Sequence, residues 1–225
     1  MAVGVSRVVL ASASPARRAL LRAAGIEPEV VVSGVDEDAL EDALAAQGRT
    51  SPAELCEALA IAKGTAVGEQ LATTARDAVV VACDSVLDLD GAPLGKPDDA
   101  DDAVRRWRAM RGRTGILRTG HFVARLDRWG ERPATGPANV SAVASTLVVF
   151  ADLDDATIDA YVATGEPLHV AGAFTLDGLG GPFVERIDGD PSNVVGLSLP
   201  LLRRMLADLD VRWTDLWDAG TPGSR

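Results

Sequence analysis

Hydrophobic and polar positions along the chain follow two different patterns. Short runs of consecutive apolar residues, of which residues 78–83 are the clearest, are typical of strands covered on both faces of a sheet. Elsewhere the apolar residues recur three and four positions apart, which predicts helices. The helix predicted after Ser51 opens with a capping pattern, a serine followed directly by proline and three residues later by Glu54. Its expected buried stripe consists of Leu55, Leu59, Ala62 and Ala66.

The same patterns predict strands and helices along most of the chain. The further strands are residues 7–11, 29–33, 115–126 and 139–150, with strand-like pieces near 170–176 and 183–187. The further helices are residues 15–24, 98–111, 155–163 and 200–209. A hairpin is predicted to turn at Asp90 and Gly91. Strands that are mixed with helices throughout argue for an α/β fold.

Length and composition limit the class of protein. The chain has 225 residues, of which 47% are hydrophobic, enough for one domain or for two lobes that share one sheet. No apolar run approaches the roughly 18 residues of a membrane span, and the run at residues 8–11 is too short for a signal peptide. We therefore expect a cytoplasmic protein that binds no membrane. Cys56 and Cys83 fit no metal spacing and no disulfide framework, which predicts small buried thiols.

Charge narrows the range of ligands. A net charge of −11 would repel a long polyanion, so we expect no nucleic-acid polymer as a partner. A small triphosphate differs, because a few local cations and a metal can hold it. Only two of the 22 basic residues are lysines, Lys63 and Lys96. We expect these two positions to need a compact point charge that a planar guanidinium group does not supply.

Residues 10–21 contain the first candidate for chemistry. A predicted strand ends there, Ser12 and Ser14 turn the chain, and Pro15 begins a helix. The free N–H groups at a helix start can bind an anion, although Ser14 could simply cap the helix. Arg17 and Arg18 would oppose the helix dipole unless an anion lies nearby, so phosphate binding and simple capping both stay open.

Carboxylates at two places could hold a metal. Asp84 directly follows the strand predicted at residues 78–83, and residues at the carboxyl ends of strands line the ligand crevice of α/β proteins. Asp84 could bind a metal or orient a water there, or it could be a turn aspartate. Asp36 and Glu37 follow the strand predicted at residues 29–33 and also offer carboxylates, with a solvated acidic loop as the alternative.

Two other segments have unusual local features. Pro97 forces Lys96 into an extended conformation, so this lysine is held more stiffly than a typical surface lysine. The glycines between residues 166 and 181 indicate a close approach of the backbone to another group, but they match neither a P-loop nor a dinucleotide fingerprint. His169 in this segment is more readily explained as a structural residue than as a catalytic one.

Taken in order along the chain, these segments resemble the motifs of the Maf family of nucleoside triphosphate pyrophosphatases. The resemblance covers almost the whole chain and includes both lysines. The matching motifs lie at residues 10–21, 35–37, 63, 83–85, 94–97, 112–120, 161–181 and 189–199. Any one of them is a weak signal, whereas the complete series in this order is a strong one.

The resemblance implies a mixed, twisted sheet flanked by helices, in two lobes around a central cleft, as in Maf and inosine triphosphatase folds. It implies one such domain over residues 1–218, with a flexible tail at 219–225, and usually a homodimer. Water would attack the α-phosphate with Mg²⁺ or Mn²⁺ as cofactor, giving a nucleoside monophosphate and pyrophosphate. Asp84 would act as general base or orient the attacking water on the metal, which Glu37 would help to hold. The phosphates would be held by Ser12, Ser14, Arg17, Lys63 and Lys96.

Three departures from the common family pattern concern the base of the nucleotide. Ala16 stands where arginine is common, Ser85 where threonine is common, and Asp177 where glutamine is frequent. Ionised Asp177 would match the two adjacent donors of guanine, and Ala16 would leave room for a purine. We therefore expect a preference for guanine-type triphosphates, 7-methyl-GTP included, in the removal of modified nucleotides. The alternatives are a pyrophosphatase for dTTP and UTP, and a non-catalytic nucleotide sensor that regulates cell division.

Overall fold

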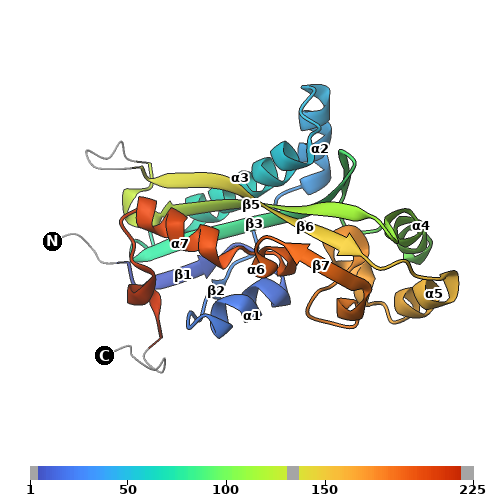
Figure 1. The fold of residues 1–225 in the computed structure, drawn as a ribbon. Coiled ribbons are helices and arrows are strands. Elements are labelled where there is room, and N and C mark those ends of the chain that lie inside the picture. Colours follow the sequence, from blue (N-terminus) through green and yellow to red (C-terminus); the bar gives the residue numbers. More distant parts are fainter. Residues whose placement is uncertain (1–4, 131–136, 219–225) are drawn as a thin grey trace.

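A mixed sheet with helices on both faces forms the centre of the computed structural model, which describes residues 5–130 and 137–218 (Figure 1). The strands lie in the order β2-β1-β3-β5-β6-β7, with β4 paired to β3. β1 is parallel to β2 and β3, and the other pairs are antiparallel. The strands are β1 Arg7–Leu10, β2 Glu29–Val30, β3 Ala78–Leu89, β4 Ala92–Leu94, β5 Thr114–Arg125, β6 Asn139–Phe150 and β7 Val184–Asp188. The predicted α/β fold is confirmed, and the tail predicted at 219–225 lies outside the described residues.

Each α-helix of the described residues begins after a serine or aspartate. The side chain of that residue accepts a hydrogen bond from a backbone N–H of the first turn, which stabilises the helix start. The helices are α1 Pro15–Ala23, α2 Glu37–Ala46, α3 Pro52–Leu71, α4 Ala100–Met110, α5 Asp155–Ala163, α6 Pro191–Val195 and α7 Leu199–Asp208. Within the described part of the chain, none of them is both long enough and apolar enough to cross a membrane.

Alternation along β3 sends its side chains to two cores on opposite faces of the sheet. Val79, Val81 and Cys83 belong to the core that α1 and α7 cover. Val80 and Ala82 belong to the core beneath α3. A third core, around Trp107 of α4, packs beyond them with α5 and the far ends of β3, β5 and β6. Both cysteines are buried free thiols, as predicted.

The predicted buried stripe of α3 is largely wrong. Of the four expected residues only Leu59 is buried, and the face that meets the sheet is made mainly of small residues. A Cβ at Gly64 would overlap the ring of Phe122, and one at Gly68 would overlap Trp129. The helix therefore lies closer to the sheet than large apolar residues would allow. The buried positions are Pro52, Cys56, Leu59, Ala60, Lys63, Gly64, Val67 and Gly68.

Other predicted elements differ from the structure in their bounds or in their type of secondary structure. The strand predicted at 170–176 is wrong: the chain forms 3₁₀ turns there, and positive φ angles at Gly172 and Ala173 interrupt any extended run. The strand predicted at 29–33 shrinks to β2, and α2 and α6 were not predicted. The hairpin is confirmed, with Asp90 and Gly91 both at positive φ between β3 and β4.

Candidate functional site

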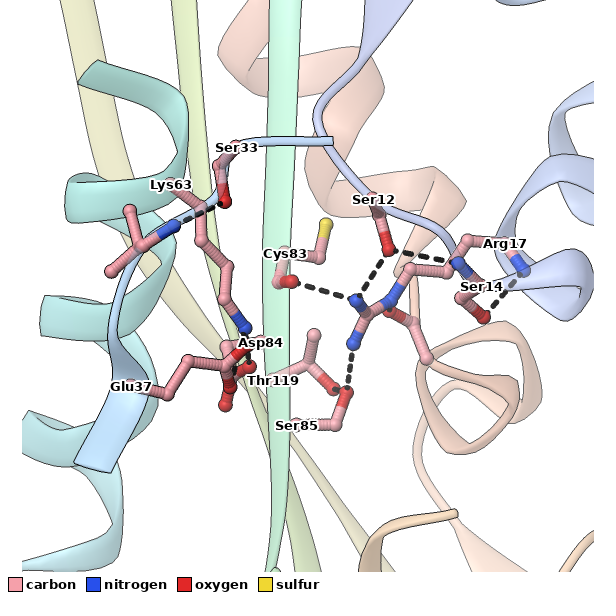
Figure 2. A network of polar contacts seen from close by, with 12 residues as sticks. Ser12, Ser14, Arg17, Ser33, Glu37, Lys63, Cys83, Asp84, Ser85 and Thr119 are labelled. Atoms are coloured by element: carbon pink, nitrogen blue, oxygen red, sulfur yellow. Dashed lines mark hydrogen bonds and ion pairs between the residues drawn. The ribbon is translucent and has the colours of Figure 1, made fainter. Parts of the chain in front are cut away.

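Asp84 and Ser85 lie inside β3, not after it. The prediction that the strand ends at Cys83 was wrong, because buried, mostly apolar positions resume at Val86 and carry β3 on to Leu89. β1 nevertheless stops opposite Val81, and β4 pairs only from Leu87. In the described residues, the edge of β3 beside Asp84 therefore has no strand partner and faces the loops that follow β1 and β2 (Figure 2).

The side chain of Asp84 points to the α3 face of the sheet. Its Oδ1 atom lies 2.5 Å from the Nζ atom of Lys63, which also lies 2.9 Å from Oε2 of Glu37 (Figure 2). The side chains of Lys63 and Asp84 are only 11% and 15% exposed. Burial raises the pKa of Asp84, and the positive charges of Lys63 and Arg17 oppose that rise. The structure thus brings together three residues that the sequence assigned to phosphate and metal binding.

A further carboxylate near this group, that of Glu41, was missed at the sequence level; among the described residues it makes no ion pair with Lys63. Loss of solvent, and then the negative charge of Asp84, raise the pKa of Glu41. Glu41 lies on α2 one helical turn after Glu37, so both carboxylates come from the same helix. The spacing of four residues was the available signal, but it has meaning only if this segment is helical, which was not predicted.

The side chain of Ser85 points to the opposite face of the sheet, toward Arg17 of α1. Arg17 donates to Ser12 Oγ at 3.1 Å, to the Cys83 carbonyl at 2.7 Å and to Ser85 Oγ at 3.0 Å (Figure 2). Its Nε atom donates to the carbonyl of Gly196 at 2.8 Å. Four of its five N–H donors are therefore used within the chain. Arg17 joins α1, β3 and the end of α6, and its fifth N–H has no acceptor among the described residues.

A directed series of hydrogen bonds continues from Arg17 into the core. Ser85 Oγ lies 2.9 Å from Thr119 Oγ1, which lies 3.4 Å from the backbone carbonyl of Asn193; both contacts are satisfied when Ser85 donates to Thr119 and Thr119 donates to that carbonyl. Each hydroxyl then accepts from one neighbour and donates to the next, and such chains are mutually strengthening. Thr119 and Asn193 are fully buried. The sequence marked residue 119 only as part of a motif.

Of the two alternatives that the sequence left open at the start of α1, the structure confirms the helix cap. Ser14 caps the helix, since its Oγ accepts from the N–H of Arg17 at 3.4 Å. Ser12 Oγ accepts from the N–H of Ser14 at 3.2 Å and from the Arg17 guanidinium. The cap does not exclude an anion site, which stays a prediction; Ser12 Oγ and the Arg17 guanidinium lie in contact beside the helix start.

The structure does not bring the remaining predicted residues into contact with this group. Lys96 is exposed; the preceding residue, Gly95, is fixed, because its carbonyl accepts from Arg106 and from the N–H of Gly172. Ala16 is half-buried on α1, one residue before Arg17. Asp177 is exposed in the loop after the 3₁₀ turns.

The loop that carries Asp177 is organised by Glu166, which was not singled out from the sequence. Its carboxylate accepts from the hydroxyls of Thr175 and Tyr161 at 2.5 and 3.1 Å. It also accepts from the N–H groups of Leu179 and Gly180. A Cβ at Gly178 would overlap this carboxylate, so the close approach that the glycines indicated is to Glu166.

Neither histidine side chain forms a hydrogen bond or ion pair with Lys63, Asp84, Glu37 or Arg17. His121 is fully buried; its Nδ1 atom lies 2.9 Å from the Thr119 carbonyl, and its Nε2 accepts from the N–H of Ser198. Burial lowers the pKa of His121 to about 4. His169 is exposed.

Two hollows on the surface lie outside the group around Asp84. One, of about 570 Å³, lies between α2 and α3 and is lined by apolar residues such as Leu40, Leu44 and Ile61. The other, of about 470 Å³, lies between the start of α3 and the β3–β4 hairpin. Neither is lined by Asp84 or Arg17, so the central cleft expected at these residues stays a prediction.

Comparison with known proteins relates the whole arrangement to one family. The family model described as Maf-like protein matches residues 7–209. A nucleoside triphosphate pyrophosphatase of Streptomyces coelicolor is 57% identical over 211 residues, which cover 94% of this chain and 94% of that protein. Proteins of the same name from Salinispora tropica and Cutibacterium acnes are 56% and 52% identical, each over 96% of this chain and over 89% and 96% of their own lengths.

Proposed function

Because the chain belongs to the Maf family, we propose that it is a nucleoside triphosphate pyrophosphatase that uses a divalent metal ion. It would convert a nucleoside triphosphate and water to the monophosphate and pyrophosphate. The observation that carries this proposal is the group of Asp84, Lys63 and Glu37 on one side of β3, with Arg17 and the two serines of the α1 loop on the other. It supplies carboxylates for a metal and a base, and cations for phosphates.

The residues present fit Mg²⁺ or Mn²⁺. These ions prefer oxygen ligands, and Mg²⁺ is usually held by one or two carboxylates together with water and substrate phosphates. Asp84 and Glu37 supply two such carboxylates. No group of three or more His, Cys, Asp or Glu side chains that could hold a metal occurs among the described residues, which suits a site that the nucleotide completes. When bound there, the ion would withdraw charge from the phosphates during the reaction.

The chain's own residues account for proton transfer and for charge. Asp84 would take a proton from the attacking water as the oxygen bonds to the α-phosphorus. Burial raises the pKa of Asp84, which makes it a better base than a solvated aspartate. The bond from the α-phosphorus to the bridging oxygen breaks, and pyrophosphate leaves with the electron pair. Lys63, Lys96 and the last free N–H of Arg17 would neutralise the leaving group.

We propose a preference for guanine-type triphosphates, 7-methyl-GTP included, on the basis of Asp177. A carboxylate only accepts hydrogen bonds, and guanine offers two adjacent donors. Uracil and thymine offer one donor between two carbonyl oxygens, which a carboxylate would repel. The loop around Asp177 is fixed by Glu166 while Asp177 itself is exposed, so its carboxylate is available to a base. Ser85 would act on base choice only indirectly, since its hydroxyl faces Arg17.

The products of the reaction test the proposal. The purified protein with Mg²⁺ or Mn²⁺ should release monophosphate and pyrophosphate, separated by anion-exchange chromatography. Diphosphate and orthophosphate as products would refute it. Nucleotide binding without turnover in either metal would instead favour the sensor. Values of kcat/KM for GTP, 7-methyl-GTP, UTP and dTTP, measured side by side, test the base preference, which fails if a pyrimidine nucleotide leads.

Two further expectations stay predictions. The homodimer rests on the family resemblance, and sedimentation-equilibrium analysis of the purified chain checks it. The cytoplasmic location is checked by fractionation of cells that express the protein.

A further inference from the structure

The ammonium group of Lys63 lies where a metal ion would need to bind. It contacts the two carboxylates that fit a divalent cation, at 2.5 Å from Asp84 and 2.9 Å from Glu37. All three side chains come from different elements, β3, α2 and α3, so the ion pairs are tertiary contacts (Figure 2). In this arrangement the carboxylates are already neutralised in part, and Asp84 is engaged by a donor.

Charge prevents the ammonium and a metal from sharing this place. Among the groups in direct contact, the two carboxylates exceed the ammonium by one negative charge, and a divalent cation added beside it would leave one excess positive charge, which the more distant carboxylate of Glu41 offsets only in part. Repulsion between charges a few ångströms apart is strong where solvent is largely excluded, as it is around Asp84 and Lys63. The phosphates of a nucleotide would remove the excess and offer the displaced ammonium a new partner.

The surrounding structure allows the ammonium to move while its backbone stays fixed. Ala60 and Gly64, on the same face of α3, are buried against the sheet and fix the backbone at Lys63. The side chain itself is a flexible four-carbon stem. Glu37 lies on α2, in which Leu44 is the only buried residue and which is preceded by Gly34 and followed by Gly48, both at positive φ. Lys63 and Glu37 can thus rearrange around an Asp84 that β3 holds in place.

We infer that Lys63 is an internal counter-ion, which a divalent metal displaces from Asp84 and Glu37 and which then pairs with the phosphates of the nucleotide. This inference rests on the proposed metal-dependent function. It makes metal binding and nucleotide binding mutually favourable, and the coupling acts equally in both directions. Metal alone binds weakly to the nucleotide-free protein, so Asp84 is freed mainly when substrate and metal arrive together.

Metal affinity without nucleotide is the first test. Calorimetric titration with Mn²⁺ would compare the unaltered chain, Lys63→Met and the matched control Lys96→Met. Both variants lose one lysine, but Lys96 is exposed and has no ion pair with any residue that the structure describes. Lys63→Met should bind Mn²⁺ about tenfold more tightly, and Lys96→Met should stay within about twofold of the unaltered chain. Equal or weaker binding by folded Lys63→Met overturns the inference.

The second test uses the unaltered protein and does not depend on the stability of a variant. With two lysines in the chain, selective ¹⁵N labelling gives two side-chain NMR signals, which Lys96→Met assigns. Titration with Mg²⁺ alone, continued until the weak binding saturates, should shift the Lys63 signal and leave that of Lys96 in place. Metal-dependent turnover with no Mg²⁺-induced shift of Lys63 overturns the inference and leaves the proposed function intact. Turnover that needs no divalent metal overturns the metal-dependent function itself.

Discussion

The chain holds two cations on opposite faces of β3, and it holds them by different means. Lys63 contacts two carboxylates, one of them on the little-buried helix α2. Arg17 donates four hydrogen bonds to neutral hydroxyls and carbonyls of the loop before α1, of β3 and of the end of α6. An ammonium group can exchange one anionic partner for another. The planar guanidinium group of Arg17, with four fixed acceptors, cannot turn without losing several hydrogen bonds at once. Lys63 is therefore suited to move and Arg17 to stay.

The difference also explains why these positions carry different cations in a chain that otherwise uses arginine. The guanidinium group is a rigid fork, and Arg17 uses that shape. An ammonium group is a point charge on a flexible stem, and the place between Asp84 and Glu37 requires only a point charge. The scarcity of lysine predicts a compact point charge at Lys63, and the structure places that charge between two carboxylates.

Removal of the charge from Asp84 should have the largest effect, because it takes away the partner of Lys63 and the proposed base together. We expect Asp84→Asn to lower kcat by about 10²–10⁴-fold, the usual range for general-base catalysis. Steady-state kinetics together with thermal unfolding would measure this. Asp88→Asn is the matched control, since Asp88 is a buried aspartate of the same strand that pairs with Arg118. Equal losses of activity in the two variants would contradict the role of Asp84.

Lowering the pH should reduce the free energy of unfolding through a residue on the Arg17 face of β3, where the hydrogen-bond acceptors are neutral. His121 lies beneath the Arg17 group and has a pKa of about 4 in the folded protein, below its ordinary 6.5. As pH falls below 6.5, the unfolded chain takes up this proton first, so stability present at neutral pH is lost between about 6.5 and 4. We expect a loss of roughly 2 kcal/mol between pH 7.5 and pH 5 from this residue.

Chemical denaturation at the two pH values would measure that loss. His121→Gln should remove this part of the pH dependence, while His169→Gln, which changes the exposed histidine, should keep it. The main physical reason is burial, which disfavours the charged imidazolium; a proton on Nε2 would also replace the hydrogen bond that this atom accepts from the N–H of Ser198. The prediction fails if both variants retain the same difference between pH 7.5 and pH 5.

Replacing Arg17 by lysine and Lys63 by arginine should have different effects on stability and on catalytic rate. Arg17→Lys should lower both thermal stability and kcat/KM, because three ammonium donors on a flexible stem cannot replace four fixed hydrogen bonds. Lys63→Arg should leave stability nearly unchanged and lower kcat, because a bidentate guanidinium group would hold Asp84 too firmly. We expect each rate to fall by about 10–100-fold, roughly 1.4–2.7 kcal/mol. Arg108→Lys, a change at an exposed arginine, serves as control and should leave both rate and stability close to normal.

Elements with a clear pattern of apolar residues were predicted from the sequence, and elements with a less regular pattern were missed or misassigned. The bounds predicted for β6 and α5 agree with the structure to the residue. The face of α3 was misassigned because its contact with the sheet uses glycine and alanine, which a search for large apolar residues passes over. α2 was not predicted, although Leu40 and Leu44 have a helical spacing.

For the candidate site, the sequence identified residues but not their partners. The motifs marked Asp84, Lys63 and Arg17, and the structure brings Asp84 and Lys63 into contact. The acceptors of Arg17 include the carbonyl of Gly196, and a backbone carbonyl at a distance of 179 residues leaves no signal in the side chains. The assignment of Asp84 and Ser85 to opposite faces could be read only after β3 was known to run through both.

The smallest effect should come from Thr119, which reaches Arg17 only through Ser85. Its hydroxyl accepts from Ser85 and donates to the carbonyl of Asn193, and the residue is fully buried. Thr119→Val keeps the shape and removes the hydroxyl, so Ser85 loses its acceptor and the Asn193 carbonyl loses a donor. An unsatisfied buried polar group costs about 1–3 kcal/mol, and we expect unfolding free energy to fall by about 1 kcal/mol.

A fall in stability alone would not separate a positioning role from a structural one, so the kinetic constants of Thr119→Val decide. If Ser85 orients Arg17 toward a phosphate, KM for the nucleotide should rise by about three- to tenfold, since a hydrogen bond to a charged group contributes roughly 1.5–3 kcal/mol and is weakened rather than lost. The kcat value should change by less than about twofold, because Asp84 and Lys63 lie on the other face of β3 and keep their contact. Thr119→Ser retains the hydroxyl and should restore KM. If Thr119→Val lowers kcat and leaves KM unchanged, the hydrogen-bond series does not act through Arg17, and the two faces of β3 are not independent.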